Sequence, residues 1–144
     1  MFICVGIGCG DRSAQSRGSV SPRICEPDTA KKAEEIAATA ASWEQAHTMF
    51  KDYSACDDGA VGEGFTESVT SLLANRWSDL PQLSTISESD ADFKEFVLRH
   101  IDETAPEDRL VAISRLARDR CADAQRSLCA LIQARLGELV PTPK

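Results

Sequence analysis

The sequence has little that could form a β-sheet. Aromatic residues make up 6% of the chain, clusters of β-branched residues are rare, and no segment alternates apolar and polar residues as a half-buried strand does. Alanine, which favours helix, is abundant instead. These features exclude a sheet-based protein and predict an all-α fold, a compact bundle of five or six amphipathic helices.

The chain also lacks an excess of basic residues. It carries 16 Lys and Arg against 23 Asp and Glu, a formal net charge of -7. Nucleic acid is excluded as a partner because phosphate binding needs a basic surface; a protein partner with a basic surface suits the charge. Acids concentrate between Asp79 and Asp108 and arginines between Arg109 and Arg135, which predicts either complementarity between packed helices or a two-signed surface.

No apolar run is long enough to cross a bilayer, so we expect no transmembrane span. The opening run, Met1–Gly10, is apolar but short, and the residues up to Pro22 are rich in Ser, Gly and Arg. We expect residues 1–24 to be a disordered leader or the remnant of an export signal. Cys9 follows Gly6-Ile7-Gly8, a faint likeness to a lipoprotein cleavage site, which leaves its lipidation open.

The sequence shows no spaced set of metal ligands and no catalytic motif. It has two histidines, His47 and His100, neither with a second ligand at zinc spacing, and it has no Cys-x-x-Cys. We therefore expect no metal, no cofactor and no enzymatic activity, and a structural or surface role for both histidines. A reactive pair of Cys56 with His47 is the cysteine-based alternative, but it competes with a disulfide at Cys56.

What the chain does have is cysteine, six residues in all. Four of them lie where helices should begin or end: Cys25, Cys56, Cys121 and Cys129. An oxidising compartment allows such thiols to join neighbouring helices, so disulfides and a periplasmic or exported protein are expected. Four free buried thiols are the alternative. The length of 144 residues suits a single helical domain over residues 25–140.

The helix pattern predicts which cysteines pair. Asp28 or Thr29 can cap a first helix, and Ser42 with Gln45 forms a capping box for a second, so we expect a hairpin with its bend near Ala41 and Ser42. One long helix through both segments is the alternative. A hairpin would bring Cys25 and Cys56 together at its outer ends, while Cys121 and Cys129 flank the turn between the last two helices.

The remaining elements follow from caps and apolar spacing. The segment Cys56-Asp57-Asp58-Gly59 is interpreted as a turn followed by an N-cap. The helix after it has apolar residues from Val61 to Trp77 and contains Gly62 and Gly64, which indicate close approach of a neighbouring helix. Residues 84–89 are interpreted as a polar connection. Further helices are expected after Ser89, which with Asp92 resembles a cap, after Thr104 and Pro106, and over a last apolar face of Leu128, Leu131, Ile132, Leu136 and Leu139.

The stretch Asp57–Glu67 is the candidate contact surface for a partner. Asp57, Asp58, Glu63 and Glu67 form a negative cluster in which Glu63 and Glu67 share one helix face. Two nearby carboxylates can hydrolyse a glycoside, so a hydrolase using Glu63 or Glu67 is one alternative. A solvated helix face is another. An EF-hand does not fit, because setting Gly59 at the required glycine puts Ser54 and Phe65 at ligand positions.

Two segments carry a family resemblance. The first is Tyr53-Ser54-Ala55-Cys56 followed by Gly59, Gly62, Glu63, Gly64 and Phe65; the second is Phe96-Val97-Leu98-Arg99-His100-Ile101, followed by residues 109–117 and Cys121. This order resembles the Tai-type immunity proteins of type VI secretion systems. The resemblance implies a small, exported, mostly helical protein with disulfides that binds and blocks a toxin, commonly a peptidoglycan amidase, in the periplasm. It carries over no toxin-contacting residue.

The functional expectation is therefore a non-catalytic periplasmic binding protein, an immunity protein that occludes a secreted bacterial toxin. In this hypothesis the four acids of the Asp57–Glu67 stretch contact basic residues of the toxin. The alternatives are a structural or accessory protein of the cell envelope and the hydrolase already named.

Overall fold

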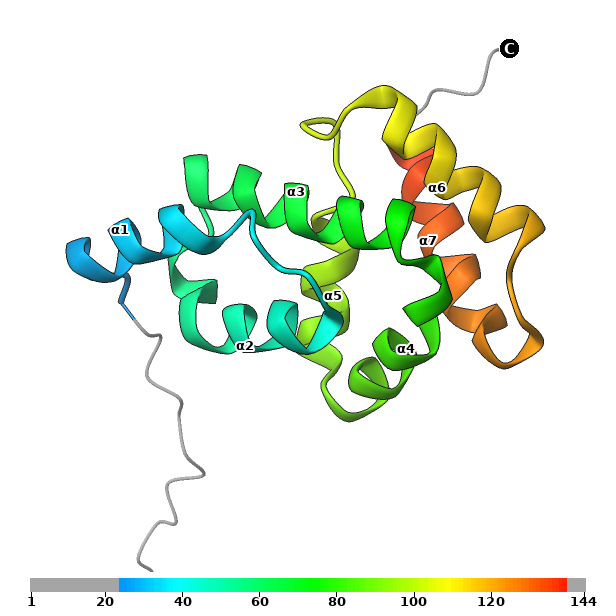
Figure 1. The fold of residues 1–144 in the computed structure, drawn as a ribbon, viewed down its shortest axis with the longest axis horizontal. Helices are drawn as coiled ribbons and strands as arrows, with labels where there is room; N and C mark the ends of the chain where they lie inside the picture. The colour runs from blue at the N-terminus through cyan, green and yellow to red at the C-terminus, as the bar shows by residue number, and fades with distance from the viewer. Residues whose placement is uncertain (1–23, 140–144) are drawn as a thin grey trace, which may run out of the picture.

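The computed structural model describes residues 24–139, and they form an all-α bundle without strands (Figure 1). The proposed leader, residues 1–24, lies outside this range except for Ile24. None of the helices between residues 24 and 139 has the length and apolar character needed to cross a bilayer. The α-helices of this part of the chain are α1 (Pro27–Ile36), α2 (Trp43–Tyr53), α3 (Gly59–Asn75), α4 (Leu80–Ser89), α5 (Ala91–Arg99), α6 (Glu107–Asp119) and α7 (Arg126–Leu139).

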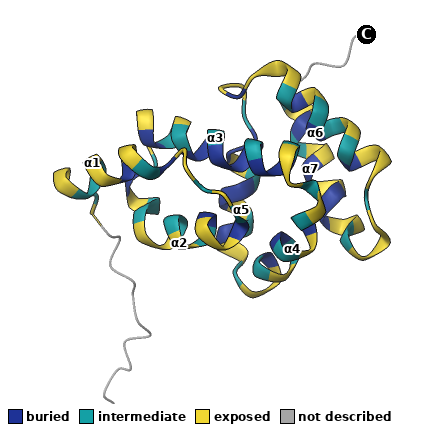
Figure 2. Cartoon of the chain, viewed as in Figure 1, coloured by how far each residue is buried: buried dark blue, intermediate teal, exposed yellow. Residues whose placement is uncertain are grey.

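Helix α3 runs through the whole bundle and contacts both ends of it (Figure 1). It packs against α1 and α2 near its beginning and against α6 further along, while α7 lies between α6 and α5. The largest buried side chains come from α2, α3, α4, α5, α6 and α7, so a single core runs through the molecule (Figure 2). Its aromatic centre is formed by Phe50, Phe65, Phe93 and Phe96, whose rings lie in mutual contact.

The predicted hairpin of the first two helices is confirmed, and its break comes earlier than expected. Helix α1 ends at Ile36, and α2 begins after the N-cap Ser42, whose Oγ accepts from the Gln45 backbone N–H at 3.2 Å. Ser68 of α3 holds the intervening segment: its hydroxyl donates to the Ala37 carbonyl at 2.6 Å and accepts from the Ala40 N–H at 3.1 Å. A contact from another helix therefore decides where α1 stops.

Both predicted disulfides are present. Cys25, just before α1, is bonded to Cys56 in the short 3-10 helix η1 (Ser54–Cys56), and Cys121 is bonded to Cys129 inside α7. The first bridge joins the outer ends of the α1–α2 hairpin, and the second spans the turn between α6 and α7. The bundle is therefore covalently closed at two of its turns.

The interpretation of residues 84–89 as a connection was wrong, because they form most of α4. Leu80, Leu83 and Ser87 are its buried residues, and Pro81 lies in its first turn, where proline is tolerated. The hydroxyls of Thr85 and Ser89 donate back to carbonyls four residues earlier, so this polar sequence is compatible with helix. The described residues thus contain seven α-helices instead of five or six.

One cap and one core position also differ from the expectation. Helix α5 is capped by Asp90, whose carboxylate accepts from the Phe93 N–H at 3.0 Å, and not by Ser89 with Asp92. Helix α6 begins at Glu107 after Pro106, close to the predicted start. In α7 the predicted apolar face packs into the core except for Leu131, which is 40% exposed.

Gly64 provides the close helix approach that the sequence indicates. A Cβ built on Gly64 would lie 2.7 Å from the Ala37 Cβ and 3.2 Å from the Ala38 backbone nitrogen. Because backbone atoms form part of this contact, the neighbouring segment cannot easily move away. Gly137 of α7, in contrast, has no atom within 4 Å of such a Cβ.

We expect Gly64→Ala to destabilise the protein by about 1–3 kcal/mol through overpacking, which exceeds the gain in helix propensity. The matched variant Gly137→Ala should stabilise it by about 0.5–1 kcal/mol, because nothing opposes the same propensity gain. Chemical unfolding of both purified variants measures the difference. Equal stabilities of the two variants would show that the α1–α3 contact tolerates a methyl group.

The two disulfides should differ in their contributions, because one closes a loop with a sequence separation of 31 and the other of 8. From loop-closure entropy we expect Cys25→Ala/Cys56→Ala to lose about 3–4 kcal/mol and Cys121→Ala/Cys129→Ala about 2–3 kcal/mol. Unfolding curves in oxidising buffer test this order. Alkylation of the native, unreduced protein followed by mass spectrometry should label none of these four cysteines, and labelling of all four would contradict both bridges.

Candidate binding site at the start of helix α3

An open hollow of about 370 Å³ lies where the start of α3 meets the end of α5 and the segment after it. Two of the four predicted contact residues, Asp57 and Glu63, line this hollow. Asp58 and Glu67 do not. The full lining is Asp57, Gly59, Gly62, Glu63, Arg99, His100, Asp102 and Thr104.

Asp57 is the central side chain of the site. It follows Cys56, whose bridge to Cys25 fixes the turn between η1 and α3. The Asp57 side chain is only 12% exposed, and its Oδ2 accepts from the Arg99 guanidinium at 2.8 Å and from His100 Nε2 at 2.9 Å. Gly62 leaves space for this carboxylate, since a Cβ there would lie 3.2 Å from Asp57 Oδ1.

The surroundings of Asp57 favour its charged form. Burial raises the pKa of this carboxyl, but hydrogen bonds and charge from His100 and Arg99 outweigh burial, so the pKa lies below its ordinary value of 3.8. A carboxylate that is hydrogen-bonded to a guanidinium and an imidazole is thus stable at neutral pH in a nearly buried position.

His100 continues this network into the core. The residue is 4% exposed, and its Nδ1 lies 3.0 Å from the hydroxyl of the buried Thr66 on α3. Thr66 donates its single hydroxyl proton to Asp102 Oδ2 at 2.9 Å. Both ring nitrogens of His100 are therefore within hydrogen-bond distance of an oxygen, that of Thr66 on one side and that of the Asp57 carboxylate on the other.

Asp102 supplies a second carboxylate near the imidazole. Burial raises the pKa of Asp102, but hydrogen bonds from the Thr104 hydroxyl and backbone N–H, and then from Thr66, lower it below 3.8 overall. The charge of His100 acts in the same direction. The carboxylates of Asp57 and Asp102 therefore both belong to the polar network around the buried His100 ring.

The order Thr66, His100, Asp57 has the connectivity of a nucleophile, a base and an orienting acid. Thr66, however, is 2% exposed within the core, and its proton points to Asp102 instead of to the imidazole. A nucleophile needs access to substrate and a base free to accept its proton. This arrangement provides neither, so the three residues form a structural network that joins α3 to α5.

The other predicted acids have different environments. Asp58 is exposed and caps α3, accepting from the Gly59 N–H at 2.8 Å. Glu67 is paired with Arg109 of α6 at 2.6 Å, and its side chain is 46% exposed. Glu63 is exposed at the hollow without an ion-pair partner in the part of the chain that the structure describes. Asp58 and Glu63 are therefore the acids whose charge is available to a partner.

Sequence reasoning missed three residues of this site: Thr66, Arg99 and Asp102. His100 was expected to be structural or on the surface, and it is structural. The one sequence signal is the polar run Arg99-His100 with Asp102, which interrupts the apolar pattern at the end of a helix. Within residues 24–139 no group of three or more His, Cys, Asp or Glu side chains is arranged to hold a metal ion.

Loss of the Asp57 charge should destabilise the protein and change its response to acid. Asp57→Asn leaves the donors of Arg99 and His100 without an anionic acceptor, so we expect a loss of about 1–3 kcal/mol at pH 7. Because the folded-state pKa of Asp57 is lowered, its contribution is complete well above 3.8 and disappears as the pH falls through the folded-state value.

The difference between wild type and Asp57→Asn should therefore shrink as the pH falls below 3.8. Denaturant unfolding at a series of pH values measures it. Asp123→Asn is the matched control, since Asp123 pairs with Arg126 but is 92% exposed, and we expect it to leave the curves unchanged. A pH-independent difference for Asp57→Asn would contradict the assigned charge interaction.

Comparison with known protein families, characterised proteins and solved structures finds no match to this chain. The resemblance to Tai-type immunity proteins stays a prediction from the sequence pattern. The described residues form an all-α bundle with two disulfides and a hollow at the start of α3 that Asp57, Glu63 and Asp102 line.

Proposed function

We propose that the protein is a non-catalytic binding protein, an immunity protein that binds a secreted bacterial toxin in the periplasm and occludes its active cleft. The observation that carries the proposal is the exposed Glu63 on α3, which lines the hollow and has no ion-pair partner among the described residues. A basic group of the toxin would meet a negative charge that needs no internal partner to be displaced.

Rigidity supports this use of the surface. The Cys25–Cys56 bridge and the two donors on Asp57 fix the segment that leads into α3. A preformed contact surface loses little conformational entropy on binding, and the saving increases affinity. Immunity by occlusion needs such affinity, because the toxin must stay covered.

The four nominated acids would act in two ways. Asp58 and Glu63 would contact the toxin directly. Asp57 and Glu67 already accept from Arg99 and Arg109, so they would hold the surface in shape. A toxin side chain can approach them without breaking these pairs, but it gains less from a charge that is already neutralised.

The disulfides support an oxidising location, as the proposal requires. The hydrolase alternative has less support, because it needs two available carboxylates. Glu67 forms an ion pair with Arg109. The other two carboxylates that line the hollow with Glu63, those of Asp57 and Asp102, both accept hydrogen bonds within the network. An envelope protein without a toxin partner has the same structural requirements, and only binding experiments separate it from the proposal.

The test uses the oxidised, purified protein as bait for the envelope and secreted proteins of the producing cells, followed by inhibition assays on any enzyme that is retained. We expect a stoichiometric block of a cell-wall hydrolase by wild type. Glu63→Lys should weaken inhibition about tenfold at low salt and less at high salt, because the contact is electrostatic. Asp58→Asn, which retains the cap, should weaken it by a smaller factor.

Glu34→Lys is the matched control, since Glu34 is an exposed acid on α1 that does not line the hollow. It should inhibit as wild type does. Retained enzymes that keep full activity in the complex would overturn the proposal in favour of an accessory protein. Turnover of muropeptides by the purified protein alone, abolished in Glu63→Gln, would establish the hydrolase instead.

A further inference from the structure

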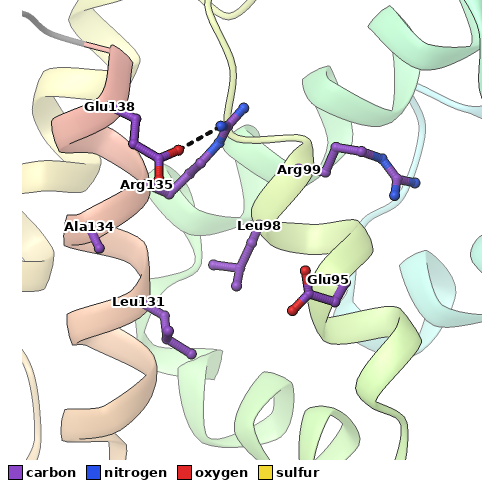
Figure 3. Close-up of a pocket in the computed structure, with 7 residues that line it drawn as sticks. All are labelled: Glu95, Leu98, Arg99, Leu131, Ala134, Arg135 and Glu138. Carbon is purple, nitrogen blue, oxygen red and sulfur yellow. Dashed lines mark hydrogen bonds and ion pairs between the residues drawn. The ribbon is translucent and has the colours of Figure 1, made fainter.

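A second hollow, of about 410 Å³, lies between α5 and α7 and is separate from the acidic one except for Arg99, which lines both (Figure 3). Its floor is apolar. Leu98 of α5 faces Leu131 and Ala134 of α7 across it. Leu131 is 40% exposed, one of three large apolar side chains exposed to this degree among residues 24–139.

The exposure of Leu131 has no explanation within the fold. Its neighbours in α7, Leu128, Ile132 and Leu136, are buried in the core, whereas Leu131 lines the hollow. A single exposed leucine is common on protein surfaces. Leu131, however, shares a hollow with another apolar side chain, and such a grouping indicates a contact surface.

The charged side chains around this floor differ in whether they have an ion-pair partner. Arg99 points away from Leu131 and donates to Asp57, while Arg135 donates to the Ile101 carbonyl at 2.9 Å and to Glu138 at 2.9 Å (Figure 3). Both cations are thus already paired. Glu95 points into the hollow and has no ion-pair partner in the described part of the chain. Glu95 therefore offers an unpaired negative charge beside the apolar floor.

We infer that the groove between α5 and α7 is a docking site for a segment of the protein partner that presents an apolar side chain with a neighbouring Arg or Lys. The apolar side chain would cover Leu98, Leu131 and Ala134, and the basic group would pair with Glu95. The inference rests on the proposed function only in taking a protein as the partner. Because Arg99 lines both hollows, one partner can occupy the acidic site and the groove together.

A second copy of the chain fits this groove less well. A two-fold dimer through the groove would place each Glu95 near its equivalent on a molecule with a net charge of -7, and like charges at an interface oppose association. A basic segment turns the same charge into an attraction. The volume suits one or two apolar side chains better than a buried small ligand, because the hollow is open along one side.

The test is a titration of the full-length, oxidised protein with a short fluorescent helical peptide that carries Leu and Arg on one face. We expect saturable binding, with amide shifts in the nuclear magnetic resonance spectrum at Glu95, Leu98, Leu131 and Ala134. A peptide with Glu in place of Arg should bind about tenfold more weakly, and one with Ser in place of Leu should also bind about tenfold more weakly.

Two pairs of variants locate the site. Leu131→Lys should weaken binding at least about tenfold, whereas Val111→Lys, at an equally exposed apolar position on α6, should change it by no more than about twofold. Glu95→Lys should weaken the Arg peptide and strengthen the Glu peptide, while Glu34→Lys should change neither. Circular dichroism of each variant verifies that the bundle is folded.

Several results would overturn the inference. These are no binding of any peptide, equal binding of the Arg and Glu peptides, equal effects of Leu131→Lys and Val111→Lys, and dimerisation that Leu131→Lys abolishes. A tenfold gain in affinity on removal of residues 140–144 would identify the chain's own last residues as the occupant. Peptide binding that persists in Glu63→Lys would support the groove even if the toxin proposal fails. Toxin inhibition that Leu131→Lys does not change would show that the toxin binds at the acidic site and not at the groove.

Discussion

The carboxylate of Asp57 is the contact through which three parts of the chain take their relative positions. It accepts from Arg99 and His100 at the end of α5, it lies against Gly62 of α3, and it follows directly on the Cys25–Cys56 bridge at the start of α1. A nearly buried anion must be paired, so any displacement of these parts would leave charge unsatisfied. The acidic hollow keeps its shape because this requirement and the disulfide act on the same turn.

The sequence specified those parts of the fold that depend on local interactions. The cap at Ser42 was predictable because its side chain bonds to a backbone N–H three residues later in the chain. The disulfide pairing followed from the helix order. Helix α4 was not predictable, because its Ser and Thr residues are typical of loops, and only burial of Leu80 and Leu83 by distant residues makes it a helix. The same holds for the end of α1, which Ser68 of α3 determines.

The candidate site was predictable to the same local extent. The acidic stretch drew attention to Asp57 and Glu63, which do share a hollow. Asp57 and Asp58 are neighbours with the same side chain, yet one is paired and nearly buried and the other is an exposed cap. Nothing in a single sequence separates them, because the difference comes from Arg99 and His100, more than forty residues later in the chain. Thr66 and Asp102 were missed for the same reason.

The distribution of charge links the two hollows. Complementarity between the acidic segment, residues 79–108, and the Arg-rich segment, residues 109–135, was one expectation, but among residues 24–139 no ion pair joins these segments. Arg109 pairs with Glu67, and Arg118 and Arg126 pair with acids close to them in sequence. The acids of the first segment are therefore not neutralised by the arginines of the second. Glu95 therefore has no ion-pair partner at the groove, just as Glu63 has none at the hollow, so an unpaired acid lines each of the two hollows that share Arg99.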